Sequence, residues 1–238
     1  MNFIDILIII ILLSFAVVGF KRGVFESLIM FVGAILVIVL SYSFKDIIGN
    51  FLLLNLPFIN FGKFMGGAVT LNVILYQTIA FILTSVVFTL AYKFLVSITG
   101  IIEKILRFTI VLGIPSKLLG LVVGFLEGYI IVYVSLFILS QPFVNINILE
   151  GSTYATKIVN ETPLLSSYME NSLEVFHEIE EVSKLKDGNE IDLKITDLIL
   201  KHNVTKPSIM QELVDKKKIE VTGIQNVIDK YKEVESNN

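Results

Sequence analysis

The sequence predicts an all-α membrane protein, a polytopic bundle of four transmembrane helices followed by a soluble helical tail. Four long apolar runs lie within residues 1–140, and residues 141–238 contain none. The chain is 54% hydrophobic and its mean hydropathy is +0.79, well above the range of soluble domains. The charge divides at the same place, with a net +3 before residue 141 and a net −6 after it. We therefore expect the two parts to face different solvents.

The first two spans are expected to form a hairpin. A bilayer core of about 30 Å needs about 20 helical residues, and the apolar runs at residues 3–20 and 24–44 have that length. The basic turn Lys21-Arg22-Gly23 separates them, so the two helices must be antiparallel neighbours. Residues 45–67 are interrupted by Pro57 and other loop-forming residues. We expect them to form an interfacial loop or a shallow re-entrant segment.

The last two spans flank a short amphipathic segment. Residues 68–98 form the third apolar run, which exceeds one bilayer thickness and should tilt or emerge from the membrane. In residues 101–110, apolar side chains recur at helical spacing against charged ones, which predicts an interfacial helix. Residues 118–140 form the fourth span, and Ser116 is a candidate N-cap for it.

The C-terminal part is expected to be a linker at residues 141–151 and a tail of amphipathic helices at residues 152–238. Helical segments are predicted from about residue 162, with Thr162 as a candidate N-cap, and from about residues 191, 205 and 223. The tail could form a small helical domain or lie on the membrane surface. Its excess of acidic residues makes it a poor ligand for anionic lipid or nucleic acid, so no nucleic-acid partner is expected.

The distribution of Lys and Arg predicts the orientation. The connections at residues 21–23 and 99–117 hold five basic residues, whereas the N-terminus and residues 45–67 hold two. Basic residues in short loops favour the cytoplasmic side. The sequence therefore predicts that both termini, and with them the tail, are extracytoplasmic.

Glycines spaced four residues apart predict a close helix contact. Gly120, Gly124 and Gly128 lie on one face of the fourth span, where they form a smooth groove that another helix can approach. Gly19 and Gly23 form a second pair at the end of the first span. The groove could pack within the bundle or between subunits, and the alternative is the general glycine enrichment of membrane helices.

Three carboxylates lie in or beside the spans. Glu127 is the deepest, ten residues into the fourth span, where a charge costs about 2.5–3.5 kcal/mol. It should therefore face the interior of the bundle, either as part of a proton or ion relay or as a buried acid bonded to Tyr, Thr or Asn. Asp5 and Glu26 lie near span ends and are expected to be interfacial.

The residue types exclude most catalytic chemistry. The chain has no cysteine, and its two histidines, His177 and His202, lie in the tail, where we expect both to be surface residues. No histidine cluster or glycine-rich phosphate loop is present. We therefore expect no metal, no cofactor, no catalytic residues and no enzymatic activity. Lys216-Lys217-Lys218 is interpreted as a solvated helix end.

Two motifs resemble those of the colicin V production protein family. One is Asp5, an Ile/Leu run and then Gly19-Phe20-Lys21-Arg22-Gly23; the other runs from Leu112-Gly113-Ile114-Pro115-Ser116-Lys117 into the three spaced glycines. The resemblance covers roughly residues 1–140. The residues that match the family pattern by position are Asp5, Gly19, Arg22, Gly23, Gly120, Gly124 and Gly128.

The resemblance implies a multi-pass protein of the bacterial plasma (inner) membrane with a role in bacteriocin, or toxin, production or export. Envelope homeostasis is a second role that we weigh equally. The leading hypothesis is a non-enzymatic protein that lies in the lipid bilayer and assembles with itself or with a membrane-protein partner. The alternative is a small transporter or channel subunit in which Glu127 and polar residues of the third span line a path for an ion or small molecule.

Overall fold

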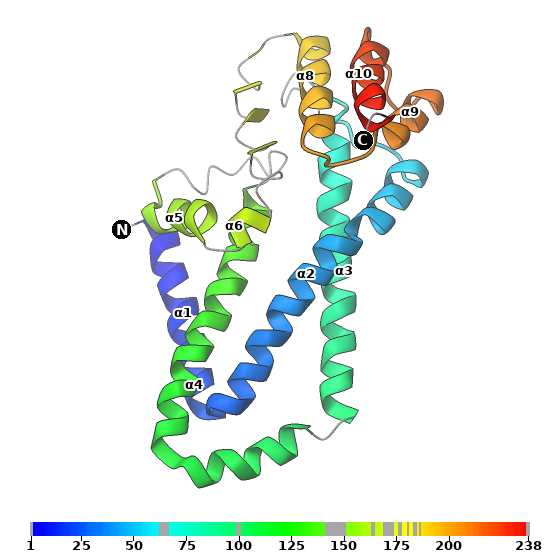
Figure 1. The fold of residues 1–238 in the computed structure, drawn as a ribbon. Coiled ribbons are helices and arrows are strands. Elements are labelled where there is room, and N and C mark those ends of the chain that lie inside the picture. Colours follow the sequence, from blue (N-terminus) through cyan, green and yellow to red (C-terminus); the bar gives the residue numbers. More distant parts are fainter. Residues whose placement is uncertain are drawn as a thin grey trace. The chain divides into compact units, whose positions relative to one another are not determined.

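The computed structural model describes residues 2–61, 67–98, 101–140, 151–162, 165–168, 174–175, 178–179, 181–182, 185 and 187–236. Helices account for all regular secondary structure in this described part (Figure 1). They are α1 (Phe3–Arg22), α2 (Val24–Asn55), α3 (Leu71–Ile98), α4 (Ile101–Leu139), α5 (Thr153–Glu161), α6 (Leu165–Tyr168), α8 (Gly188–Lys201), α9 (Pro207–Asp215) and α10 (Ile224–Ser236).

Four of the described helices are long and apolar enough to cross a membrane. They are Phe3–Arg22, Val24–Asn55, Leu71–Ile98 and Gly113–Leu139. Large apolar side chains such as Leu90 and Phe94 are exposed along them, as is expected where lipid is the solvent. The predicted fold class, an all-α polytopic bundle of four spans, is therefore confirmed.

The chain forms two compact units. The first comprises Met1–Ser43, Ile82–Ser140 and Ile146–Thr162, and the second comprises Phe44–Phe81, Gln141–Asn145 and Pro163–Asn238. Helices α2 and α3 contribute residues to both units. The predicted division into residues 1–140, a linker at 141–151 and a tail at 152–238 stays a prediction, and residues 141–150 lie outside the described residues.

Helix α2 continues beyond its predicted end at residue 44. It is helical to Asn55, so the prediction of a loop or re-entrant segment was wrong for residues 45–55. Apolar residues recur there at helical spacing, and Pro57 is the first residue that prevents further extension. A helix of 32 residues is about 48 Å long, which exceeds the hydrocarbon core. A helix of this length must therefore tilt or extend past the hydrocarbon core.

A backbone kink at Gly113 marks the start of the fourth span. Its φ of 56° and ψ of −132° are not helical, and a Cβ there would meet no neighbouring atom. Glycine is therefore favoured by the positive φ rather than by lack of space. Pro115 follows in the first turn of the new helix, where a missing N–H costs little. Residues 101–112 precede the kink as helix, but their side chains lie outside the described set.

In the first unit, polar side chains of α3 attach to backbone groups of α2. The Tyr92 hydroxyl donates to the Ile29 carbonyl at 2.5 Å, and the Thr84 hydroxyl donates to the Ser41 carbonyl at 3.2 Å. Hydroxyl groups in hydrocarbon gain from such partners because water is absent. These residues of the third span therefore hold neighbouring helices together.

The second unit has one apolar core, to which the tail and the ends of α2 and α3 both contribute. Side chains at helical spacing on α8, such as Ile191, Ile195 and Ile199, are fully buried. They pack in the same cluster as Leu53 of α2 and Leu71 of α3. Helices α8, α9 and α10 of the tail therefore share one core with residues 44–81, whereas α5 belongs to the first unit.

Lys218, which is far from α2 in the sequence, caps the C-terminal end of that helix. Its Nζ donates to the carbonyls of Leu53 at 2.6 Å and Leu56 at 2.8 Å, and it lies 5.3 Å from the centroid of the Phe58 ring. The carbonyls at a helix end have no partner within the helix, and a cation there also opposes the helix dipole. Burial lowers the pKa of Lys218, and Lys216 adds to this effect. The interpretation of residues 216–218 as a wholly solvated helix end was therefore wrong for Lys218.

Asp192 attaches α8 to the start of α3, and its replacement by alanine is expected to destabilise the second unit by about 2–3 kcal/mol. Its Oδ1 accepts from the Thr70 backbone N–H at 2.8 Å and from the Thr70 hydroxyl at 2.6 Å, both buried. Without it, a buried N–H loses its partner. Chemical denaturation of the full chain in detergent, followed by circular dichroism, measures the change.

The matched control is Asp197→Ala on the same helix. Asp197 accepts from Lys230 and Tyr231 at the surface, where such pairs contribute about 1 kcal/mol or less. Asp192→Asn retains an acceptor and should lie between the two. Equal losses for Asp192→Ala and Asp197→Ala would contradict the assigned role of Asp192.

Candidate functional site between α1 and α4

Helices α1 and α4 meet through glycines whose backbones touch. A Cβ on Gly19 would lie 2.7 Å from the Gly124 Cα and closer still to the Gly120 carbonyl oxygen. In the reverse direction, a Cβ on Gly120 would lie 2.7 Å from the Gly23 carbonyl carbon. Because each neighbour is backbone, no rotamer change could make room for a side chain. The two helices therefore depend on glycine for their close approach.

The groove of α4 continues past this contact. A Cβ on Gly124 would lie 2.5 Å from the Phe15 carbonyl oxygen, and one on Gly128 would lie 2.6 Å from the Phe15 Cβ. The three spaced glycines thus accept the face of α1 that carries Phe15 and Gly19. The two glycine motifs found in the sequence lie in a single interface within one chain.

An ion pair lies beside the glycine interface. The Arg22 Nη1 donates to Glu127 Oε2 at 3.3 Å, and the Arg22 Nε is 3.6 Å from Glu26 Oε1. The Glu127 side chain is 11% exposed and that of Arg22 is 31% exposed. Because Gly128 packs on Phe15, Glu127 lies about 10 Å from the C-terminal end of α1. The long Arg22 side chain reaches in to compensate its charge.

The partner of Glu127 differs from those considered from the sequence. Tyr, Thr and Asn were weighed as neighbours, whereas the structure places Arg22 there. The sequence indicates Arg22 only by its place in a family motif and predicts no partner for it. The signal available in the sequence was charge balance, since Arg22 sits beside the Gly19–Gly23 pair and Glu127 beside Gly128. Only the meeting of the two glycine faces brings them together.

Ser116 caps a different helix from the one expected. Its Oγ accepts a hydrogen bond from the Val24 backbone N–H at 3.2 Å, and its side chain is buried at 1% exposure. Val24 is the first residue of α2, where the N–H groups have no partner within the helix. The prediction that Ser116 caps the fourth span was therefore wrong. It connects the start of that span to the turn between the first two.

Asp5 joins the N-terminal end of α1 to the start of α5. Its Oδ1 accepts from the Ser152 hydroxyl at 2.5 Å and from the Tyr154 N–H at 3.4 Å, and its Oδ2 accepts from the Asn2 N–H at 2.9 Å. The residue is 4% exposed. A carboxylate at a helix N-terminus is favourable because the helix dipole is positive there. Asp5 is thus covered by protein, which its place near a span end did not indicate.

The arrangement is suited to holding helices together. Its polar groups are paired with one another, and its centre is a contact between backbones. Within the described residues, no group of three or more His, Asp or Glu side chains is placed to hold a metal ion. The residues that define this site are the glycines, Arg22, Glu127 and Ser116.

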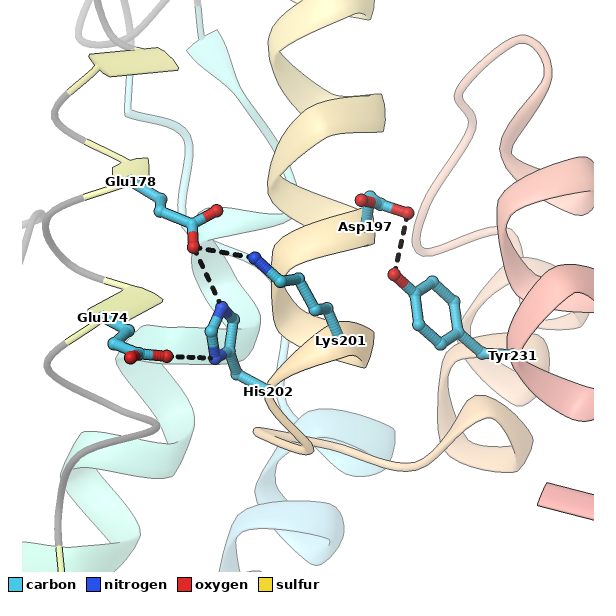
Figure 2. A network of polar contacts seen from close by, with 6 residues as sticks. All are labelled: Glu174, Glu178, Asp197, Lys201, His202 and Tyr231. Carbon is cyan, nitrogen blue, oxygen red and sulfur yellow. Dashed lines mark hydrogen bonds and ion pairs between the residues drawn. The ribbon is translucent and has the colours of Figure 1, made fainter. Parts of the chain in front are cut away.

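A separate polar network lies in the second unit (Figure 2). The His202 Nδ1 is 3.2 Å from Glu174 Oε2 and its Nε2 is 3.2 Å from Glu178 Oε1, while Lys201 Nζ lies 2.9 Å from the same Glu178 oxygen. His202 is 7% exposed, so the prediction of a surface histidine was wrong for it. It follows the last residue of α8, where the turn brings its ring inward. His177 lies outside the described residues.

Lys201→Gln is expected to raise the pKa of Glu178. The hydrogen bond from Lys201 is the largest cause that holds this pKa below its ordinary value; burial opposes it, and His202 lowers the pKa further. A lowered pKa means that the folded state favours the ionised form. Its stabilising contribution is therefore present above the unfolded value of about 4.3 and is lost as pH falls through the folded value.

An NMR titration of the Glu178 carboxyl carbon measures this change. His202→Asn serves as the comparison and should raise the pKa less, because the histidine is the weaker cause. An unchanged Glu178 pKa in Lys201→Gln would show that the contact does not form in solution.

Comparison with known proteins finds a family match over the part of the chain that contains the four spans. A family model described as "Colicin V production protein" matches residues 4–163, which include α1 to α5. An uncharacterised transmembrane protein of Bacillus subtilis (strain 168), YshB, is 33% identical over 178 residues, covering 70% of this chain and 94% of the relative. No solved structure matches.

Proposed function

The chain belongs to the colicin V production protein family, and from this premise we propose that it is a non-enzymatic membrane protein that supports bacteriocin production or export and envelope homeostasis. In this proposal it acts by assembling with itself or with a membrane-protein partner. The four spans form a fixed scaffold, and the helical domain of the tail presents a docking surface outside the hydrocarbon.

The ion pair between Glu127 and Arg22 favours a scaffold role over a role in transport. An ion relay needs a carboxylate that can exchange its partner, whereas Glu127 is bonded to Arg22 beside a backbone contact that leaves no space for a side chain. Two polar residues of α3, Asn72 and Thr84, are also engaged. Asn72 bonds to Ile59 and Val69, and Thr84 bonds to Ser41.

Two experiments test the proposal. In a strain that lacks the gene, secretion of a bacteriocin reporter and resistance to detergent should fall, and both should recover with the full chain. Purified protein in liposomes should show no flux of protons or monovalent cations above empty vesicles. Flux that disappears in Glu127→Gln would replace the scaffold proposal with the transport alternative, in which Glu127 lines the path.

We also propose that the protein lies in the bacterial plasma membrane with the tail outside. Within the first unit, the contact between Asp5 and Ser152 places the start of the tail at the N-terminal end of α1. The Val24–Ser116 contact places Lys21, Arg22 and Lys117 near one another at the opposite end. Basic residues favour the cytoplasmic side, which supports an extracytoplasmic tail.

Labelling of introduced cysteines tests the orientation. The chain has no native cysteine, and Lys117 and Glu220 are exposed. With an impermeant thiol reagent on intact cells, Glu220→Cys should react and Lys117→Cys should not. The reverse pattern would place the tail in the cytoplasm and overturn the proposed orientation.

A further inference from the structure

An apolar hollow lies under α5 in the first unit. Its walls come from Ile8, Ile9 and Leu12 of α1 and from Phe125 of α4, and Lys157 and Glu161 of α5 lie at its edge. Its volume is about 360 Å³, which is within the range of small-molecule sites. Because the wall residues belong to membrane spans, the hollow is open to hydrocarbon chains rather than to water.

The depth of the hollow follows from the contact between α1 and α5. Asp5 bonds to Ser152 and Tyr154, so α5 begins level with the first turn of α1. Ile8 to Leu12 lie about 5–10 Å deeper along the helix. The amphipathic α5 therefore lies at the bilayer interface, with Ala155, Ile158 and Val159 buried against the protein.

A second hollow adjoins the first on the polar side of α5. It is lined by Ser152, Thr156 and Asn160, among others, and has a volume of about 440 Å³. Lys157 and Glu161 line both hollows. The two charged side chains thus lie where an apolar space meets a polar one, which is the polarity profile of a phospholipid.

The charges at this junction select among headgroups. Lys157 and Glu161 are exposed, and neither forms an ion pair with another described residue. A cation beside a carboxylate fits a headgroup with a phosphate and a primary ammonium. An anionic headgroup without an amine would be repelled by Glu161, and a quaternary ammonium has no N–H to donate to it.

We propose that the hollows under and beside α5 bind one phospholipid with a phosphoethanolamine headgroup. One of its acyl chains lies against Leu12 and Phe125, its phosphate binds Lys157, and its ammonium donates to Glu161. An empty apolar space in contact with lipid would forfeit dispersion contacts, so an acyl chain is its expected occupant. The bound lipid would fill the space between α5 and the ends of α1 and α4.

The absence of tryptophan makes the test direct. Phe125→Trp introduces a single fluorophore at the hollow, and the full chain is reconstituted with phospholipids that carry brominated acyl chains, which quench tryptophan on contact. Brominated phosphatidylethanolamine is expected to quench with about threefold higher relative affinity than brominated phosphatidylcholine, the gain of one exposed charge pair. Leu90→Trp, on an exposed face of α3, is the matched control and should show no preference.

Charge variants distinguish the headgroup from the chain. In the Phe125→Trp background, Glu161→Gln should reduce the preference to that of Leu90→Trp, because only the ethanolamine headgroup donates to Glu161. Lys157→Gln should weaken quenching by both lipids alike and leave the preference unchanged, because both headgroups carry the phosphate. Circular dichroism should be unchanged in both variants. Equal quenching by both lipids at Phe125→Trp would overturn the proposal. A preference for brominated phosphatidylglycerol would also overturn it, because that headgroup has no amine for Glu161.

Discussion

Gly120→Ala is expected to destabilise the four-span unit by about 2–3 kcal/mol. The added Cβ would meet the backbone of Gly19 and Gly23, so the two helices must separate. Overpacking of this kind typically costs about 1–3 kcal/mol of stability. Alanine recovers at most about 1 kcal/mol through its higher helix propensity. Titration of the purified protein with sodium dodecyl sulfate in mixed micelles, followed by circular dichroism, measures the loss.

Gly33→Ala is the matched control for this substitution. Gly33 also lies within a span, but its Cβ would meet the tip of the Tyr92 ring, 2.5 Å from the hydroxyl oxygen. A side-chain tip can move at the cost of the hydrogen bond to Ile29, about 1 kcal/mol. If Gly120→Ala were no more destabilising than Gly33→Ala, the backbone contact between α1 and α4 would be refuted.

Arg22→Gln is expected to destabilise the same unit by about 2 kcal/mol, and more than Glu127→Gln does. Loss of one partner of a buried ion pair costs about 3–5 kcal/mol, and we reduce this figure because the Arg22 side chain is 31% exposed. The larger loss arises because Arg22→Gln leaves a carboxylate in the hydrocarbon without its cation. The same mixed-micelle titration measures both variants.

The double variant Arg22→Gln with Glu127→Gln completes a thermodynamic cycle. It should recover most of the loss of Arg22→Gln, because neither charge remains. The surface pair Lys194–Glu190, whose side chains are about half exposed, provides a control cycle with an expected coupling of about 0.5 kcal/mol or less. Strict additivity for Arg22 and Glu127 would mean that the two charges do not interact.

Both predictions bear on how this family member could function. Because the glycine contact and the ion pair join α1 to α4, the two helices move as one body, and any partner must bind to faces outside their interface. Their exposed sides, α5 and the helical domain of the tail are then the surfaces available for assembly. Variants at Gly120 and Arg22 should accordingly impair complementation of the gene-deletion strain in proportion to their loss of stability.

Much of the fold follows from the sequence because hydrophobic run length is a direct physical requirement of the bilayer. The four spans could be predicted because each needs about 20 apolar residues in a row. The end of α2 could not, because residues 45–55 carry both apolar and charged side chains. Their helical state depends on burial against the tail and on the Lys218 cap, which lies far along the chain.

The glycine face of α4 also was predictable only in part from the sequence. Spacing by four residues placed Gly120, Gly124 and Gly128 on one side of a helix, since helix geometry is local. That spacing holds no information about which helix fills the groove. Gly19 and Phe15 fill it because α1 and α4 lie side by side in the folded chain, and this arrangement then pairs Arg22 with Glu127.

The sequence by itself determined the membrane class, the number of spans and the glycine motifs, because each rests on composition or on short-range periodicity. Its two motifs also indicated the family, by their resemblance to those of known members. Only the tertiary structure decided the partners: Arg22 for Glu127, Val24 for Ser116, Ser152 for Asp5 and Thr70 for Asp192. Polar groups in hydrocarbon or in a protein core must find partners. Which partner each finds depends on contacts between residues that are far apart in the chain.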